Sequence, residues 1–140
     1  MNSNVKSILC ASLLVIFCNV VHAEIAVIVN LANTDAIKKE NIASLYLAKT
    51  KTFPGGKSAI PLDRPEGSPI RVEFISKVIE KDESQMKSYW SRLIFTGKGV
   101  PPKVLESDAE VKEMVARNPD AIGFIDAGAV DSTVKVVATF

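Results

Sequence analysis

The sequence is poor in cysteine and histidine, and the few residues of these types all lie near its start. Its two cysteines and single histidine are Cys10, Cys18 and His22. Beyond residue 23, Ser–His and Cys–His catalysis and cysteine or histidine zinc sites are therefore excluded. Disulfides are excluded as well. The remaining 117 of the 140 residues must fold by burying an apolar core, which a chain of this length can do.

An excess of charge of either sign is also missing. The whole chain has 17 basic and 16 acidic residues, and Lys6 is the only basic residue among the first 23. Residues 24–140 therefore carry 16 of each sign. This balance gives no indication of nucleic acid as a partner, and no long charged block suggests a disordered tail. Any binding must depend on a local group of residues.

The first 23 residues have the pattern of a secretory signal peptide. Lys6 supplies a positive start, an apolar run extends from Ile8 to Val21, and "VHA" ends at Ala23 with small residues at the cleavage positions. The apolar run is shorter than the ~20 residues that a membrane-spanning helix needs. We expect cleavage after Ala23, export to the periplasm, and a single domain over residues 24–140.

Apolar periodicity predicts that strands and helices alternate along residues 24–140. "EIAVIVN" at residues 24–30 is almost entirely apolar, which is typical of a strand buried on both faces by helices. This order of elements indicates an α/β domain with a mixed or mostly parallel sheet. The further strands are expected at 59–62, 121–125 and 133–137, and the helices at 36–48, 69–78, 83–95 (with Asp82 as cap) and 107–117 (with Ser107 or Asp108 as cap).

The segment "PLDRPEGSPI", residues 61–70, is the strongest candidate for a binding site. Ser68 stands at the expected N-cap of a helix, where unpaired N–H groups and the helix dipole favour an anion. Arg64 precedes it, and a guanidinium suits bidentate contact with an oxyanion. Arg71 in the first turn is unusual, because acidic residues complement that end of a helix. The alternative is a structural turn and cap, with Asp63 or Glu66 pairing with Arg64.

Other candidates for chemistry are weaker. Asp63, Glu66 and Asp126 follow predicted strands, where α/β proteins often hold ligands, but they form no defensible catalytic pair. Tyr89 and Trp90 fit the buried face of a helix. The segment "FPGGK" does not have the spacing of a phosphate-binding loop. The sequence therefore predicts no cofactor, no metal and no enzymatic activity.

Four segments in order resemble periplasmic phosphate-binding proteins of ABC transporters. "NIASLYLAKTKTF" resembles that family's "I-x-x-I-F/Y-L-G-K-I-x-x-W" helix and loop, and "IPLDRPEGSPIRVEFISKVI" resembles its "R-x-x-x-S-G-T" segment. "YWSRLIFTGKGVPP" and "VKEMVARNPDAIGFID" follow at similar spacing, the latter like the family's "V-x-x-x-P-G-A-I-G-Y". The resemblance covers nearly all of residues 24–140 but only one of the family's two lobes. It implies a single three-layer lobe of a type II periplasmic-binding-protein fold, with a central mixed sheet flanked by helices.

The resemblance and the helix-start pattern together predict an anion site of four residues. Arg64 and Ser68 match the family's phosphate-binding arginine and serine, while Arg71 and the N–H of Ile70 lie in the same first turn. Two positions depart from the family's pattern, because Pro69 replaces a glycine and has no N–H, and Ile70 replaces a threonine and has no hydroxyl. Phe53 replaces the family's tryptophan, which is a change in packing.

Two functions are consistent with these observations. The first is a secreted, non-enzymatic module that binds phosphate or a related oxyanion, with a second copy or a partner protein supplying the missing wall of the cleft. The second is an accessory protein that has kept the fold without the ligand and docks to a membrane transporter, a sensor or itself. The second function predicts an exposed apolar patch around Phe53, Pro54 and the loop "GKGVPP" at residues 97–102.

Overall fold

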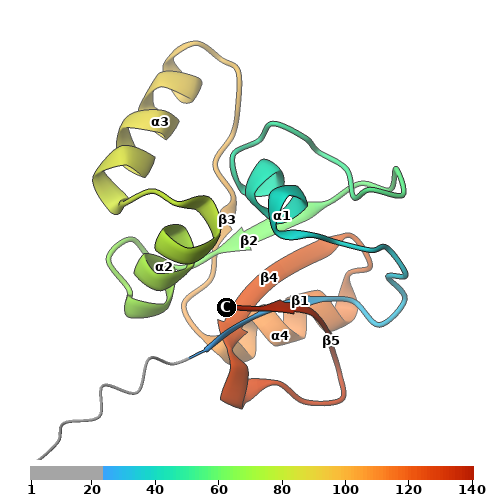
Figure 1. The fold of residues 1–140 in the computed structure, drawn as a ribbon. Coiled ribbons are helices and arrows are strands. Elements are labelled where there is room, and N and C mark those ends of the chain that lie inside the picture. The colour runs from blue at the N-terminus through green and yellow to red at the C-terminus, as the bar shows by residue number, and fades with distance from the viewer. Residues whose placement is uncertain (1–23) are drawn as a thin grey trace, which may run out of the picture.

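The computed structural model describes residues 24–140, so the predicted signal peptide and its cleavage site lie outside the described residues. Five strands form one sheet in the order β3-β2-β4-β1-β5 (Figure 1). The strands are β1 (Ile25–Val29), β2 (Ile60–Asp63), β3 (Lys103–Val104), β4 (Ala121–Asp126) and β5 (Lys135–Thr139). The predicted strands at 24–30, 59–62, 121–125 and 133–137 are confirmed within one or two residues. The short strand β3 falls in a segment predicted to be a loop.

The sheet is mixed, as predicted. Strand β1 pairs antiparallel with both β4 and β5, whereas β2 is parallel to β3 and β4. All five residues of β1 are buried, because helices cover both faces of the sheet. The antiparallel pairing of β1 lets the two ends of the described chain meet, since Ile25 and Phe140 exchange two backbone hydrogen bonds of 2.9 Å.

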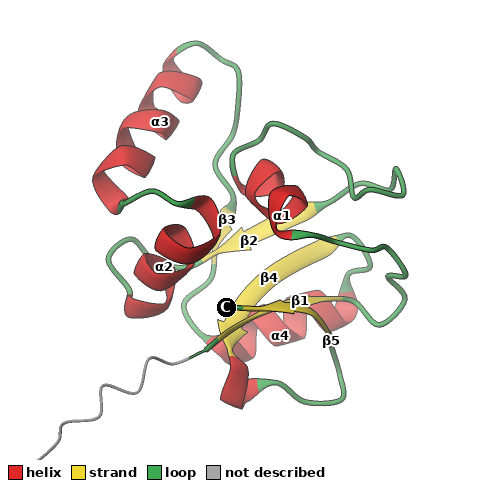
Figure 2. Ribbon diagram, in the orientation of Figure 1, coloured by secondary structure: helices red, strands yellow, loops and turns green. Residues whose placement is uncertain are grey.

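Helices cover the two faces of the sheet and complete a three-layer architecture (Figure 2). On one face lie α1 (Lys39–Tyr46), α2 (Pro69–Phe74), the π-helix η1 (Ile75–Ile79) and α3 (Glu83–Phe95). Helix α4 (Asp108–Arg117) and the 3-10 turn η2 (Ala127–Ala129) lie on the other face. The predicted architecture of a central mixed sheet flanked by helices is confirmed. Within residues 24–140, no helix combines the length and apolar character that crossing a membrane would require.

Three aromatic side chains form the centre of the larger core. The rings of Phe74 and Phe124 stack with their centroids 3.9 Å apart, and Tyr46 meets Phe74 edge-on at 4.7 Å. The Tyr46 hydroxyl donates to the carbonyl of Leu62 at 2.8 Å, which satisfies its polar group inside the core. This cluster links α1 and the end of α2 to β4 of the sheet.

The helix ends explain where the predictions were wrong by a few residues. Helix α1 begins at Lys39 and not at residue 36, because the side chain of Asn41 accepts the N–H of Lys38 at 2.8 Å. The helix predicted at 69–78 changes to π-helical hydrogen bonding at Ile75 and ends at Glu80, whose φ is 59°. Asp82 and Ser107 are the observed caps of α3 and α4.

Candidate anion site at the start of helix α2

The turn between β2 and α2 leads to the N-terminus of α2, where the backbone N–H groups have no partner within the helix. Gly67 has a φ of 78°, a conformation that favours glycine, and it brings the chain round to Ser68. Ser68 is the N-cap of α2 and Pro69 its first residue, as the sequence predicted. The Ser68 side chain forms no hydrogen bond to the helix, so it is not used as a cap.

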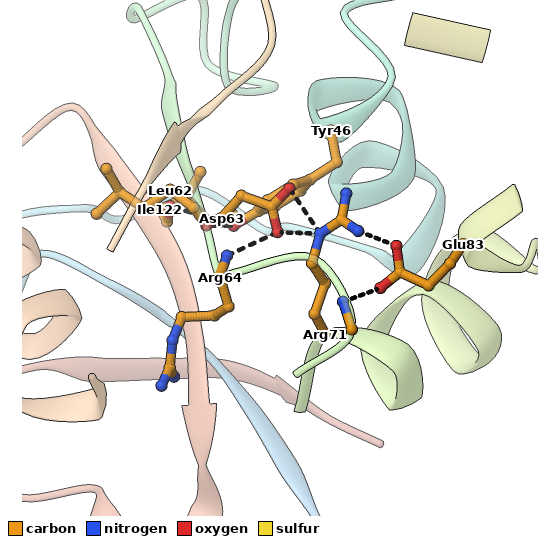
Figure 3. Close-up of polar contacts among 8 residues, drawn as sticks. Tyr46, Leu62, Asp63, Arg64, Arg71, Glu83 and Ile122 are labelled. Carbon is orange, nitrogen blue, oxygen red and sulfur yellow. Dashed lines mark hydrogen bonds and ion pairs between the residues drawn. The ribbon is translucent and has the colours of Figure 1, made fainter. Parts of the chain in front are cut away.

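Arg71 is held between two carboxylates. Its Nε donates to both oxygens of Asp63 at 3.1 Å, and its Nη1 forms an ion pair with Glu83 at the start of α3 (Figure 3). The other oxygen of Glu83 accepts the backbone N–H of Gly67 at 3.2 Å. Glu83 therefore takes a guanidinium and a loop N–H, which are the donors that an oxyanion would use at this place.

Arg64 points away from this cluster (Figure 3). Its Nη1 lies 2.5 Å from Oδ1 of Asp108 at the start of α4, and its Nη2 donates to the Glu106 carbonyl at 3.2 Å. The structural alternative considered from sequence paired Arg64 with Asp63 or Glu66. The observed partner is Asp108, and Asp63 pairs with Arg71 instead. The two arginines of the predicted site are thus brought to opposite sides of the turn.

Two polar atoms at the turn have no partner among residues 24–140. They are Nε of Arg64 and Oγ of Ser68, and both atoms are buried. The N–H of Ile70 likewise has no acceptor among residues 24–140, as expected at the second position of a helix. Buried polar groups normally find a hydrogen-bond partner, so unpaired ones call for a physical explanation.

Burial governs the electrostatics of Asp63. It raises the pKa of Asp63 above the ordinary value, and the charge of Arg71 and the hydrogen bonds from Arg64 N–H and Arg71 only partly oppose it. Burial lowers the pKa of Arg71, but the charge of Asp63 and the contacts with Glu83 outweigh it, so the pKa of Arg71 is raised. Arg71 is therefore a firmly charged group whose positive charge is already matched inside the protein.

Sequence reasoning did not identify Glu83 or Asp108 as part of this region. Each opens a helix, where an acidic residue is explained by the helix dipole alone. Their contacts with Arg71 and Arg64 span 12 and 44 residues, and no sequence pattern indicates such pairings. Of the weaker candidates, Asp126 caps η2 by accepting the Gly128 N–H at 2.7 Å, and Glu66 is exposed. Within residues 24–140, no group of acidic residues has the arrangement of a metal site.

Comparisons with known proteins identify the fold. No protein-family model and no curated protein matches the sequence. Among solved structures, the chain is similar to an ABC-type phosphate transport receptor from Vibrio cholerae, with a TM-score of 0.60, 23% identity, and coverage of 82% of this chain and 46% of the receptor. It is also similar to PstS from Borrelia burgdorferi, with a TM-score of 0.56, 15% identity, and coverage of 83% and 47%.

The matched region is less than half the length of each of these proteins, yet it takes in more than four fifths of this chain. The mixed sheet with helices on both faces is common to them and to the chain described here. Residues 24–140 therefore have the fold of one lobe of a phosphate-binding protein of the ABC transporter type.

Proposed function

We propose that this chain is an exported, non-enzymatic interaction module that uses a phosphate-binding-protein lobe to dock with a partner protein. The observation that carries the proposal is the occupation of the candidate anion site by internal carboxylates. Glu83 holds Arg71 and the N–H of Gly67, and Asp108 holds Arg64. In this reading, side chains of the protein itself have taken the positions that a bound oxyanion would need.

The balance of charge around the turn supports this reading. The single guanidinium of Arg71 faces two carboxylates, from Asp63 and Glu83, while on the other side of the turn Arg64 is matched by Asp108. A phosphate dianion entering here would meet a net negative group, and like charges repel most strongly where burial lowers the effective dielectric constant. Displacing Glu83 or Asp108 would leave a carboxylate without its partner, which is also costly.

The fold supports a binding role that is not catalytic. The two similar proteins, a phosphate transport receptor and PstS, are binding proteins and not enzymes. Residues 24–140 also contain no histidine or cysteine to serve as a nucleophile or a general base near neutral pH. We propose a periplasmic location for the protein. Its candidate partners there are a membrane transporter, a sensor or a second copy of the chain.

Oxyanion binding at Arg64, Ser68, Ile70 and Arg71 is the second candidate function. The unpartnered Ser68 Oγ and Arg64 Nε favour it, because a small anion could satisfy both atoms together with the Ile70 N–H. Phosphate and sulfate are the ligands to test. This function requires that at least one of the internal ion pairs opens when the ligand enters.

Calorimetric titration of the purified protein with phosphate and with sulfate separates the two functions. We expect no saturable heat up to millimolar ligand and no rise in melting temperature. A saturable phosphate signal that Arg64→Ala abolishes would instead establish the second candidate and overturn the first.

A further inference from the structure

The charge of the protein is balanced overall but unevenly distributed. Residues 41–62 contain three lysines, and residues 84–105 contain three lysines and one arginine. Neither segment contains a single aspartate or glutamate, although residues 24–140 carry as many acidic as basic residues. The first segment comprises most of α1, the loop that follows it and most of β2. The second comprises α3 without its first residue, Glu83, the loop after it and β3.

These two acid-free segments face each other across a groove of about 230 Å³. Leu45 and Ala48 line it from the first segment, and Trp90, Val100 and Pro102 line it from the second. Lys51 lines the groove from the first segment and Lys98 lines it from the second. Neither forms an ion pair with any residue of 24–140, so both ammonium groups are available to a partner.

Exposed apolar side chains lie at the end of α3 and in the following loop, of which Val100 lines the groove itself. Phe95 is 93% exposed, Val100 85% and Ile94 54%, all at the end of α3 or in the loop after it. The helix projects from the body of the molecule in Figure 1. Its position is nevertheless defined, because the Tyr89 hydroxyl donates to the Leu47 carbonyl at 2.5 Å and Gly99 lies close against the Trp90 ring. Grouped exposed apolar side chains of this kind are typical of interaction sites.

We propose that this groove binds an acidic segment of a partner protein, with an apolar side chain of that segment seated against Trp90 and its carboxylates on Lys51 and Lys98. This inference rests on the proposed docking function and names the chemistry of the partner. Apolar burial supplies the affinity, while the two lysines select acidic over basic sequences and speed the encounter. The Arg71–Glu83 pair does not line this groove. It lines a separate hollow, and Trp90 contributes to the lining of both.

The same observations disfavour two other occupants. A second copy related by two-fold symmetry would bring the same surface against itself, and the lysine-bearing sides of the two grooves, which carry no acidic residue, would then meet. A membrane surface could take up Phe95 and Val100, but it would not reach the floor of the groove, where Trp90 is only 8% exposed. A narrow peptide segment of a partner protein fits both the concave groove and the lysines that line its two sides.

Selection from a display library of random 12-residue peptides, followed by titration of the selected peptides, tests the proposal. Trp90 is the only tryptophan and lines both the groove and the hollow beside Arg71, so a change in its fluorescence is assigned to the groove only where the Lys51 and Lys98 reversals weaken it. We expect the selected peptides to combine acidic residues with an apolar one and to change the Trp90 emission in a saturable way. The charge reversal Lys51→Glu with Lys98→Glu should weaken binding at least tenfold. The matched control, Lys38→Glu with Arg117→Glu, changes the net charge equally and should leave binding within twofold.

The remaining outcomes overturn the proposal. The selection could enrich no peptides, or it could enrich neutral or basic ones. The Lys51 and Lys98 reversals could leave peptide binding unweakened. The Trp90 emission could change with vesicles of anionic lipid but not with peptides. Concentration-dependent self-association that the two reversals abolish would show that a second copy occupies the groove, against the proposal. If peptides fail to bind and phosphate still gives no heat, the acidic partner segment is contradicted but the proposed docking function is not. Saturable phosphate binding by the wild type overturns the proposed function itself.

Discussion

Arg64 and Arg71 show how a buried cation acquires partners that a linear pattern does not reveal. Both side chains are about nine-tenths buried, and an unpaired guanidinium at that depth would be strongly destabilising. The fold satisfies them with Asp108, Asp63 and Glu83. A guanidinium is also a good ligand for an oxyanion, so the choice between a structural and a binding role depends on the few carboxylates that each arginine meets.

Glu83→Ala should therefore create an oxyanion site. The substitution frees Nη1 of Arg71 and the N–H of Gly67, two donors that converge on one point. We expect phosphate and sulfate affinity to rise at least tenfold over the wild type, about 1.4 kcal/mol, as measured by calorimetry. Glu66→Ala removes an exposed carboxylate from the same turn and is the matched control, for which no gain is expected. Equal behaviour of the two variants would contradict the role assigned to Glu83.

Asp63→Asn should change how stability depends on pH. Because burial raises the pKa of Asp63 in the folded state, the folded protein holds its proton more tightly than the unfolded chain does. The stability contributed by Asp63 thus increases as pH falls from neutrality toward the ordinary aspartate pKa of about 3.9. Urea unfolding at pH 7 and pH 5 should show wild type gaining relative to Asp63→Asn at the lower pH. A shift in the opposite sense would mean that the Arg71 pair, and not burial, dominates.

At the scale of elements, the contact between β4 and α4 leaves no room for a side chain at Gly123. A β-carbon there would lie 2.5 Å from Cγ1 of Val111, a buried residue of α4. Glycine at this position lets the helix approach the sheet closely, and it helps to set where Asp108 meets Arg64.

Gly123→Ala should consequently destabilise the protein by about 1–3 kcal/mol, because α4 must move or strain to admit the methyl group. Chemical denaturation measures the loss. Gly128→Ala is the control, since its β-carbon would meet only an oxygen of the half-buried Asp126 side chain at 3.0 Å. If both substitutions cost the same, close packing at Gly123 is not the cause.

At the scale of the whole molecule, the order of the strands makes the end of the described chain an edge strand that packs against the core. Strand β5 covers one edge of β1, whose residues Val27 and Ile28 are fully buried. Without β5, the backbone of a central, apolar strand would become an open sheet edge, which invites aggregation.

Removing residues 135–140 should therefore abolish cooperative thermal unfolding, as followed by circular dichroism. The substitution Val136→Thr, at a position 39% exposed on β5, changes the strand without removing its backbone and should preserve a cooperative transition. Cooperative melting of the shortened chain would show that four strands suffice.

Much of the fold could be predicted because its signals are local. The uninterrupted apolar run of β1 predicted burial on both faces, and Asp82 predicted the start of α3 because a capping carboxylate accepts an N–H three residues away. The prediction of an exposed apolar patch around Phe53 was wrong for that residue, which is only 2% exposed. The loop at residues 97–102 does expose Val100, and Ile94 and Phe95 at the end of α3, which were not part of the prediction, are exposed as well.

The sequence by itself determined which chemistry is excluded, which segments become strands and helices, and that Arg64 and Ser68 stand at a helix start. Those properties depend on residue types and on spacings of a few residues. Only the tertiary structure decided that Arg64 meets Asp108 and that Arg71 lies between Asp63 and Glu83. It alone brought the acid-free segments to one groove. These contacts join residues far apart in the chain, and the packing of whole helices against the sheet creates them.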